Sequence, residues 1–249
     1  MLKLAEIPFA LPPERQFSPS MGSVFHGALM ERLPEGLAAR LHESALRPYS
    51  QYLFYDKRAR RCLWRLGFLT EEAAARLLDA IAAPGALFLK QKGYAVKLGE
   101  PRTVAETDYG AIADGIFQNA DAPRGARLDF LTVASFRQGG VYVLWPDLAL
   151  IFQSLQNRWN AFSPKMKIDA PELGRQLAEN CRVVSYRLES RPFSVEGQNI
   201  HGFSGSLRLR FTGNDMTRRL MGLLISLAPF SGVGVKTALG MGAAGAKIW

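Results

Sequence analysis

Two of the three histidines of this chain, His26 and His42, lie near its start, whereas His201 lies far along the sequence. A single straight helix would turn residues sixteen positions apart to directions roughly 160° apart. Pro34 and Gly36 interrupt the segment between them, so the two imidazoles could instead converge across a bend. Imidazole can take a proton from a ribose 2′-hydroxyl or give one to a leaving 5′-oxygen near neutral pH. The pair is therefore a candidate general acid and base; the alternative is a structural histidine, which we expect for His201.

Cationic and phenolic side chains follow the second histidine closely. Arg47, Tyr49, Tyr52 and Lys57 all come within a short stretch after His42, and any of them could supply a charge or a hydrogen bond. A nearby cation would stabilise the charge that develops on a phosphate during cleavage. These are the parts of a ribonuclease that needs no metal. We expect no metal site and no cofactor, because the acidic residues are scattered and neither cysteines nor histidines recur at metal-ligand spacing.

A second stretch lies near the C-terminus, where glycines surround a lysine and a threonine: Gly232, Gly234, Lys236, Thr237, Gly240 and Gly242. Glycine lets successive backbone N–H groups turn toward one point, and a concave row of such donors suits phosphate oxygens. The stretch is not a nucleotide-binding P-loop, because Val235 separates Gly234 from Lys236 and only thirteen residues follow that lysine. We expect it to contact an RNA backbone. The simpler alternative is a loop that joins a helix to a last strand.

The chain is basic, with 31 lysines and arginines against 22 acidic residues, a formal net charge of +9 and a pI near 9.8. This balance favours a polyanionic partner, either nucleic acid or an anionic membrane surface. One cluster of cations occupies a predicted turn: Lys57, Arg58, Arg60 and Arg61. We expect the turn to follow an RNA backbone, and the alternative is ordinary solvated surface.

Nothing in the sequence points to export or to a membrane. The first residues are interrupted by charges and by Pro8, unlike a signal peptide. The longest mainly apolar run, at 220–230, is too short to cross a bilayer. Cys62 and Cys181 cannot form a disulfide framework, and we expect both to be reduced thiols of a cytoplasmic protein.

The first hundred residues alternate between helical and strand-like patterns. Apolar residues recur at three and four positions in the predicted helices and at every second position in the predicted strands. The predicted elements are a strand at 2–10, helical pieces at 22–33 and 37–45, strands at 49–55 and 62–69, a helix at 71–82, and short strands near 86–90 and 94–98. Thr70 is the predicted cap of the helix at 71–82, and Pro84–Gly85 its predicted stop. The order is β-α-β-β-α-β.

The second half repeats this order. Residues 99–125 contain several glycines and prolines without a sustained period, so we interpret them as a connecting region. The elements predicted after it are strands at 128–136, 182–190, 202–211 and 241–249, a hairpin strand at 141–145, and helices at 146–159 and 216–228. Two copies predict an α+β protein with tandem ferredoxin-like domains, the topology of RNA-recognition modules. We predict an N-terminal domain at 1–120 with the histidines and a C-terminal domain at 121–249 with the Gly-rich loop.

Two stretches of the chain resemble a known protein family. Residues 232–242, Gly-Val-Gly-Val-Lys-Thr-Ala-Leu-Gly-Met-Gly, are similar to its C-terminal Gly-rich signature. His26-Gly-Ala-Leu-Met and the segment from His42 to Tyr52 are similar to its N-terminal helix and the catalytic segment after it. The family is that of the CRISPR-associated endoribonucleases, members of the RAMP superfamily that process precursor CRISPR RNA by cutting its repeats. The resemblance spans most of the chain and is weakest at 70–125.

The resemblance implies that one phosphodiester in each repeat is cut by attack of the 2′-hydroxyl, without metal, leaving a 2′,3′-cyclic phosphate and a 5′-hydroxyl. It implies a general acid/base role for His42 and a second-histidine role for His26. Members with a Tyr-His-Lys set place the tyrosine in the first helix, where this chain has Met30, and the lysine where this chain offers Arg47. We therefore expect Arg47 and Tyr52 to support the histidines.

The implied partners are the precursor repeat and the mature CRISPR RNA. Subunits of a CRISPR effector complex and a second copy of the chain are further candidates. The alternative function is a non-cleaving RNA-binding subunit of such a complex, which would share the fold, the Gly-rich loop and the charge but lack a working acid/base pair. A role at a membrane surface is a weaker alternative, because no predicted helix combines a strongly basic face with an apolar one.

Overall fold

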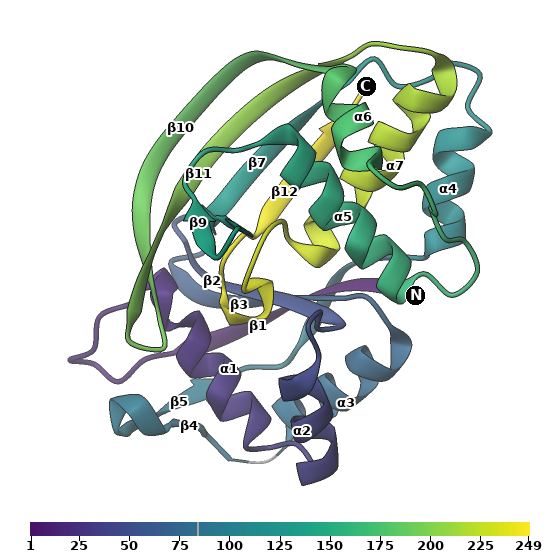
Figure 1. The fold of residues 1–249 in the computed structure, drawn as a ribbon. Helices are drawn as coiled ribbons and strands as arrows, with labels where there is room; N and C mark the ends of the chain where they lie inside the picture. Colours follow the sequence, from purple (N-terminus) through teal and green to yellow (C-terminus); the bar gives the residue numbers. More distant parts are fainter. Residues whose placement is uncertain (84) are drawn as a thin grey trace.

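Two antiparallel sheets organise the chain, one in each half (Figure 1). The computed structural model describes residues 1–83 and 85–249. Within these residues no helix is both long enough and apolar enough to cross a bilayer. The predicted boundary at residue 120 falls in the segment between the last helix of the first half and the first strand of the second, and it stays a prediction.

The first half holds six strands and four helices of the described residues: β1 (Leu2–Ala10), α1 (Gly22–Met30), α2 (Glu35–Glu43), β2 (Tyr49–Asp56), β3 (Arg61–Phe68), α3 (Glu71–Ala82), β4 (Leu87–Leu89), β5 (Tyr94–Leu98), β6 (Arg102–Thr107) and α4 (Tyr109–Phe117). The strand order is β2-β3-β1-β5-β4, and β6 also pairs with β1. β5 pairs with the end of β1 and β6 with its start, so two strands share the fourth position of a ferredoxin-like sheet.

Helix α3 forms because its apolar residues recur on one face, which packs into the core of the first half. Helix α1 is buried along nearly its whole length, between this sheet and the Gly-rich loop. The Thr70 side chain accepts a hydrogen bond from the Ala73 N–H at 3.2 Å and caps α3, as predicted. Phe25 of α1 packs edge-on against Trp64 of β3, with ring centroids 5.2 Å apart. Pro84, predicted with Gly85 to end α3, lies outside the described residues.

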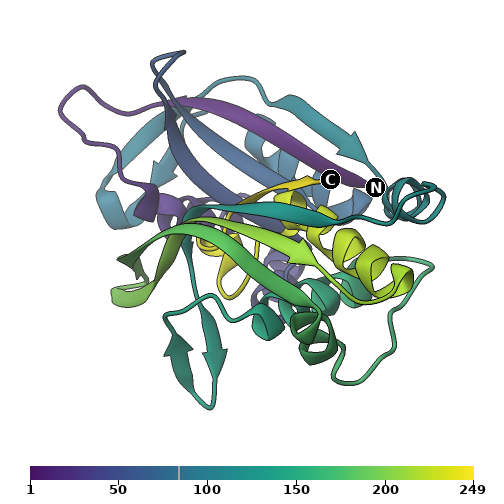
Figure 2. The same cartoon turned by 90° about the horizontal axis from the view of Figure 1, so that it is seen from above.

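The second half contains β7 (Gly125–Ala134), β8 (Phe136–Gln138), β9 (Val141–Val143), α5 (Leu148–Phe162), α6 (Leu173–Glu179), β10 (Cys181–Val195), β11 (Gln198–Phe211), α7 (Asp215–Ser231) and β12 (Ala244–Ile248). Its main sheet has the order β10-β11-β7-β12, and β8 and β9 form a separate hairpin that projects from the body in Figure 2. The first and second halves therefore repeat the same arrangement, which confirms the predicted α+β tandem ferredoxin-like fold.

The interpretation of residues 99–125 as a connection was wrong, because they contain β6 and α4. β6 has no apolar period of its own: most of its side chains are exposed, and it is held by the backbone ladder to β1 and by an ion pair from Lys3 to Glu106 at 3.0 Å. The Asp108 side chain caps α4 by accepting from the Ala111 N–H at 2.9 Å.

The hairpin of β10 and β11 is longer than predicted. The sequence places strand ends at Ser190 and Gly202, whereas the ladder continues to the pair Val195 and Gln198. Pro192 cannot donate to a ladder, but β10 is an edge strand and tolerates it. The hairpin tip therefore reaches past the main sheet toward the first half.

The Gly-rich loop, residues 232–243, lies between the two halves and includes a short 3-10 turn at Thr237–Leu239. In Figure 1 it is the yellow segment that reaches the blue strands β2 and β3. The last turn of α7, just before the loop, makes a tight contact there: the Ser50 hydroxyl donates to the Phe230 carbonyl at 2.7 Å, and a Cβ at Gly67 would lie 2.1 Å from the same oxygen. Only glycine at that position of β3 lets the backbones approach this closely.

Candidate active site

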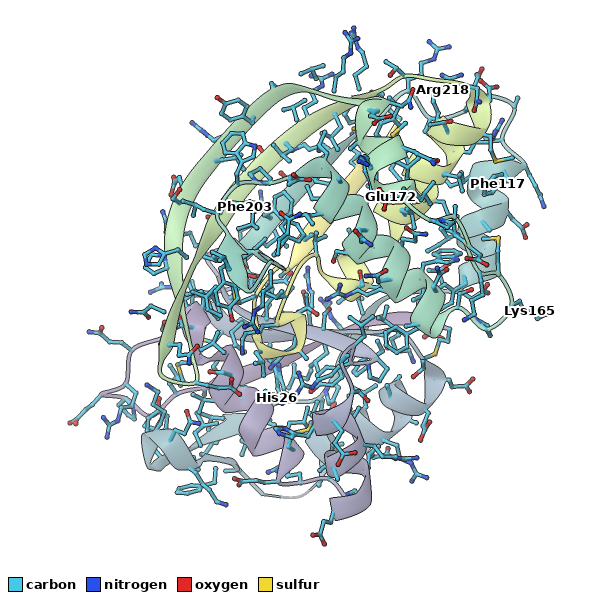
Figure 3. All side chains as sticks on the ribbon, in the orientation of Figure 1. His26, Phe117, Lys165, Glu172, Phe203 and Arg218 are labelled. Atoms are coloured by element: carbon cyan, nitrogen blue, oxygen red, sulfur yellow. The ribbon has the colours of Figure 1, made fainter. Side chains whose placement is uncertain are left out.

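His26 and Tyr49 form a buried pair between α1 and β2. The Nδ1 atom of His26 lies 2.7 Å from the Tyr49 hydroxyl, and the two rings stack with an interplanar angle of 21°. His26 is 7% exposed and Tyr49 is fully buried. Figure 3 labels His26 in α1, in the half that carries β1 to β6. The helix thus places one imidazole nitrogen on a phenol and leaves Nε2 for another partner.

Burial, together with the positive charges of Arg47 and His42, lowers the pKa of His26 from 6.5 to about 3. The imidazole is therefore neutral at physiological pH. Burial also raises the pKa of Tyr49, so its hydroxyl keeps its proton. The pair is a neutral hydrogen-bonded unit with cationic groups beside it.

His42 and Arg47 come from the end of α2 and the segment that follows it. His42 lies in the last turn of α2 and is exposed, so an RNA can reach it. The Nε of Arg47 donates to the Leu41 carbonyl at 2.9 Å, which satisfies one of the free carbonyls at the helix end. Both residues lie near enough to His26 for their charges to lower its pKa, so three of the four predicted catalytic residues share one region of the first half.

Tyr52, the fourth, does not join them. Successive side chains of a strand point to opposite faces, so Tyr49 and Tyr52 lie on opposite sides of the sheet. Arg65 of β3 donates to the Tyr52 hydroxyl at 2.8 Å, and it also donates to the Glu6 carboxylate through Nε at 3.0 Å. Tyr52 belongs to this second network, and Tyr49 takes the position beside the histidine.

The Gly-rich loop directs many of its N–H groups into the protein. Within the loop, the Val233 N–H donates a hydrogen bond to the Gly242 carbonyl at 2.8 Å. Three further N–H groups donate to residues outside the loop, each at 2.9 Å: Gly234 to the Ser154 hydroxyl, Val235 to the Ser135 carbonyl and Gly242 to the Val133 carbonyl. Gly232, Thr237 and Gly240 are buried, and Lys236 is half-buried and pairs with Glu196 at 3.2 Å. The predicted open row of donors is therefore largely engaged in folding, and Lys236 is the loop's charged residue, with a partly exposed side chain.

The predicted basic turn lies at the other end of β2 from Tyr49. Lys57, Arg58, Arg60 and Arg61 are all exposed, and the Asp56 carboxylate accepts from the backbone N–H groups of Arg58 at 2.9 Å and Ala59 at 3.1 Å. A strand of eight residues spans about 25 Å at 3.3 Å per residue. The turn therefore cannot touch the phosphate that the histidines would act on.

Sequence analysis missed a row of cations on the open face of the second sheet. Arg208 of β11 pairs in register with Arg127 of β7, which pairs in turn with Lys247 of β12. Like charges directly opposite one another destabilise a sheet. The only sequence signal was the alternation of Arg208 and Arg210 with leucines, which indicates a strand with a basic outer face.

Two adjoining hollows of about 790 and 450 Å³ cover this face, and both are lined by Arg208, Ser185 and Trp249. The Arg208 guanidinium lies over the Trp249 ring, 5.2 Å from its centroid. This is within the roughly 6 Å over which a cation–π contact acts. Trp249 is 44% exposed. We call the surface formed by Arg127, Arg208, Arg210, Lys247 and Trp249 the basic sheet face. Among the described residues, no three His, Cys, Asp or Glu side chains converge as metal ligands would.

The comparisons with known proteins agree on one family. The family described as "CRISPR-associated endoribonuclease Cas6" matches residues 128–244. A protein of that name from Mycobacterium tuberculosis is 33% identical over 93% of this chain and 73% of its own length. Another from Streptococcus thermophilus is 28% identical over 88% of each chain. A solved structure of a Cas6 product complex superposes with a TM-score of 0.80 at 26% identity, covering 98% of this chain and all of the other.

Proposed function

This chain belongs to the Cas6 family of CRISPR-associated endoribonucleases, and from that membership we propose how its residues cut RNA. It is an endoribonuclease that processes CRISPR RNA and binds CRISPR RNA repeats. The names of its relatives favour this activity over a non-cleaving subunit. The single observation that supports the mechanism is the buried His26–Tyr49 pair, whose histidine feels the charges of His42 and Arg47.

We assign the two histidines to opposite roles. A buried neutral imidazole can accept a proton, whereas an exposed imidazole can exchange protons with solvent. His26 is neutral, and when its Nδ1–H donates to the Tyr49 oxygen its Nε2 is free to accept a proton. His42 is exposed beside it and in its charged form is the acid.

The proposed reaction needs no metal. The 2′-oxygen gives its proton to Nε2 of His26 and forms a bond to phosphorus, while the bond from phosphorus to the 5′-oxygen breaks. The 5′-oxygen takes a proton from His42, which leaves a 2′,3′-cyclic phosphate and a 5′-hydroxyl. Arg47 stabilises the negative charge that develops on the phosphate.

The basic sheet face is the proposed track for RNA beyond the cut. The repulsion between its like charges is relieved when a phosphate backbone lies across them. The exposed Trp249 ring offers a surface on which a base can stack. Lys236 and the basic turn at 57–61 are further proposed contacts, and the loop glycines contribute by shaping the loop. Effector-complex subunits and a second copy of the chain stay predicted partners. Cys62 and Cys181 are both free thiols, as a proposed site of action in the cytoplasm requires.

The test is cleavage of a repeat transcript in EDTA by single-residue variants. We expect His42→Ala to abolish cutting while RNA binding survives, and His26→Ala to slow cutting strongly. His201→Ala is the matched control, because His201 is exposed on β11 outside the site, and it should cut at the wild-type rate. Undiminished cutting by His42→Ala would refute the assignment, and an unchanged rate for His26→Ala would make His26 structural.

A further inference from the structure

Gln51 links three separate parts of the molecule through its side-chain amide. Its Nε2 donates to the Gly22 carbonyl at the start of α1 and to the Ala238 carbonyl in the Gly-rich loop, each at 2.8 Å. Its Oε1 accepts from the indole N–H of Trp64 in β3. Gln51 is 1% exposed. The amide thus has both donors and its acceptor engaged in a buried site.

The loop that Gln51 contacts is itself fixed to the second half of the chain. The Arg158 guanidinium of α5 donates to the Gly234 carbonyl at 2.8 Å and to the Thr237 hydroxyl at 3.2 Å. Arg158 is 6% exposed, and among the described residues it forms no ion pair with a carboxylate. Burying such a charge is costly unless every donor is satisfied, so the carbonyls around it are held firmly in place.

The other end of the linkage lies beside the catalytic pair. Gly22 precedes His26 by four residues, which is about one turn of α1. A Cβ at Gly22 would lie 2.7 Å from the Leu239 carbonyl, so the helix start rests directly on the loop backbone. Gln51 and Tyr49 are two residues apart on β2 and therefore share one face of the strand. One side chain thus contacts the helix of His26 and belongs to the strand of Tyr49.

We propose that Gln51 is a positioning residue that sets the geometry of the His26–Tyr49 pair by holding α1 and β2 against the Gly-rich loop. The second half of the chain thereby completes the acid/base site of the first half. This proposal rests on the proposed function insofar as the pair takes part in cleavage. It assigns the loop a role that does not require the loop to touch RNA.

Gln51→Glu tests the proposal at nearly constant side-chain volume. A carboxylate cannot donate to the Gly22 and Ala238 carbonyls, so α1 and the loop should separate. The matched control is Gln156→Glu: Gln156 is 9% exposed, and its Nε2 donates to two backbone carbonyls, Ile168 at 3.0 Å and Ala170 at 3.2 Å, within the second half. Both variants lose the same kind of buried interaction, but only one of them adjoins the pair.

Three measurements separate positioning from stability: the single-turnover cleavage rate at saturating protein, the affinity for a repeat with a 2′-deoxy cut site, and the melting temperature. We expect Gln51→Glu to lose on the order of 100-fold in rate with little change in affinity, because small misplacements of reacting groups have effects of that size. Gln156→Glu should melt earlier but, below its melting temperature, cut at nearly the wild-type rate. Equal rate losses in the two variants, or a wild-type rate in folded Gln51→Glu, would overturn the proposal.

A nitrogen-15 NMR measurement tests the positioning role of Gln51 independently of whether His26 is catalytic. In nitrogen-15 spectra the His26 Nδ1 signal reports its hydrogen bond to Tyr49, and we expect that signal to shift in Gln51→Glu but not in Gln156→Glu. An unshifted signal refutes the positioning role, whatever the rate of His26→Ala shows about catalysis. If Gln51→Glu does not fold, Gln51→Met removes the two donors without adding a charge, and the same comparisons apply.

Discussion

A buried imidazole with cationic neighbours makes the folded protein sensitive to acid. The pKa of His26 is lowered from 6.5 to about 3 in the folded protein, so below pH 6.5 the unfolded chain binds a proton that the folded protein does not. The neutral, buried His26 therefore costs the fold no stability above pH 6.5, and the free energy of unfolding decreases as the pH falls from 6.5 toward 3. The loss amounts to about 1.4 kcal/mol for each pH unit.

Urea unfolding at pH 7.5 and pH 5.5 measures this effect. Between the two, wild-type protein should lose about 1.4 kcal/mol more of its free energy of unfolding than His26→Gln, which cannot take up the proton. Other titrating groups contribute to both proteins and cancel in the difference. An identical loss in the two proteins would show that His26 is not held neutral by the fold.

The sequence predicts the two catalytic histidines, but it does not determine which tyrosine lies beside them. The order of His26, the break at Pro34 and His42 indicated a converging pair, and α1 and α2 are where that reasoning put helices. Which face of β2 meets α1 depends on the strand's register, and residues on both faces of this strand are buried. Spacing alone therefore cannot separate the two tyrosines: the prediction is Tyr52, whereas the packing of α1 selects Tyr49.

At the scale of elements, two glycines of α1 offer a matched pair of substitutions. A Cβ at Gly22 would lie 2.7 Å from the Leu239 carbonyl and 2.9 Å from Cα of Gly240, whereas a Cβ at Gly27 would meet nothing within 4 Å. Gly22→Ala should cost about 1–3 kcal/mol of stability because the contact is overpacked. Gly27→Ala should be neutral or stabilise by up to about 1 kcal/mol, because alanine favours a helix.

Thermal unfolding of the two variants checks this prediction. The melting temperature of Gly22→Ala should fall, and that of Gly27→Ala should stay or rise. If Gly22→Ala melted like wild type, the helix start would have room to move off the loop, and the close contact with Leu239 would not constrain α1.

Elements were predictable where a local signal coincided with packing. Thr70 and the one-sided apolar pattern after it gave α3 both its start and its buried face. β6 gave no such signal, because it depends on a free edge of β1 that the sequence does not reveal. The tip of the β10–β11 hairpin was missed for a related reason: Phe193 and Ile200 are buried by Leu239 and Met241 of the Gly-rich loop rather than by neighbours in sequence.

At the scale of the whole molecule, part of the net charge of +9 is concentrated on one surface. Arg208, Arg127 and Lys247 form one row across three strands. If this row binds phosphates, each lost contact should reduce the slope of log affinity against log salt concentration by about 1. Arg208→Ala should therefore flatten the salt dependence of repeat binding, with little effect on single-turnover cutting at saturating protein.

Arg175→Ala is the control for this experiment. Arg175 lies on α6, exposed and paired with Glu172 at 3.4 Å, so the variant loses the same charge away from the basic sheet face. Fluorescence anisotropy at several salt concentrations gives both slopes. Equal slopes for the two variants would mean that the charge acts only through long-range attraction and that the basic sheet face is not a track.

The contact between Gln51 and Ala238 can form only late in the synthesis of the chain. The two residues are 187 positions apart, and a ribosome adds about 5–20 residues per second, so roughly 10–40 s pass between their synthesis. During that interval α1 and β2 have been made, but the segment that they rest on has not. A nascent chain would therefore hold its histidines without their support, and the nuclease would mature only after the Gly-rich loop has been translated and docked.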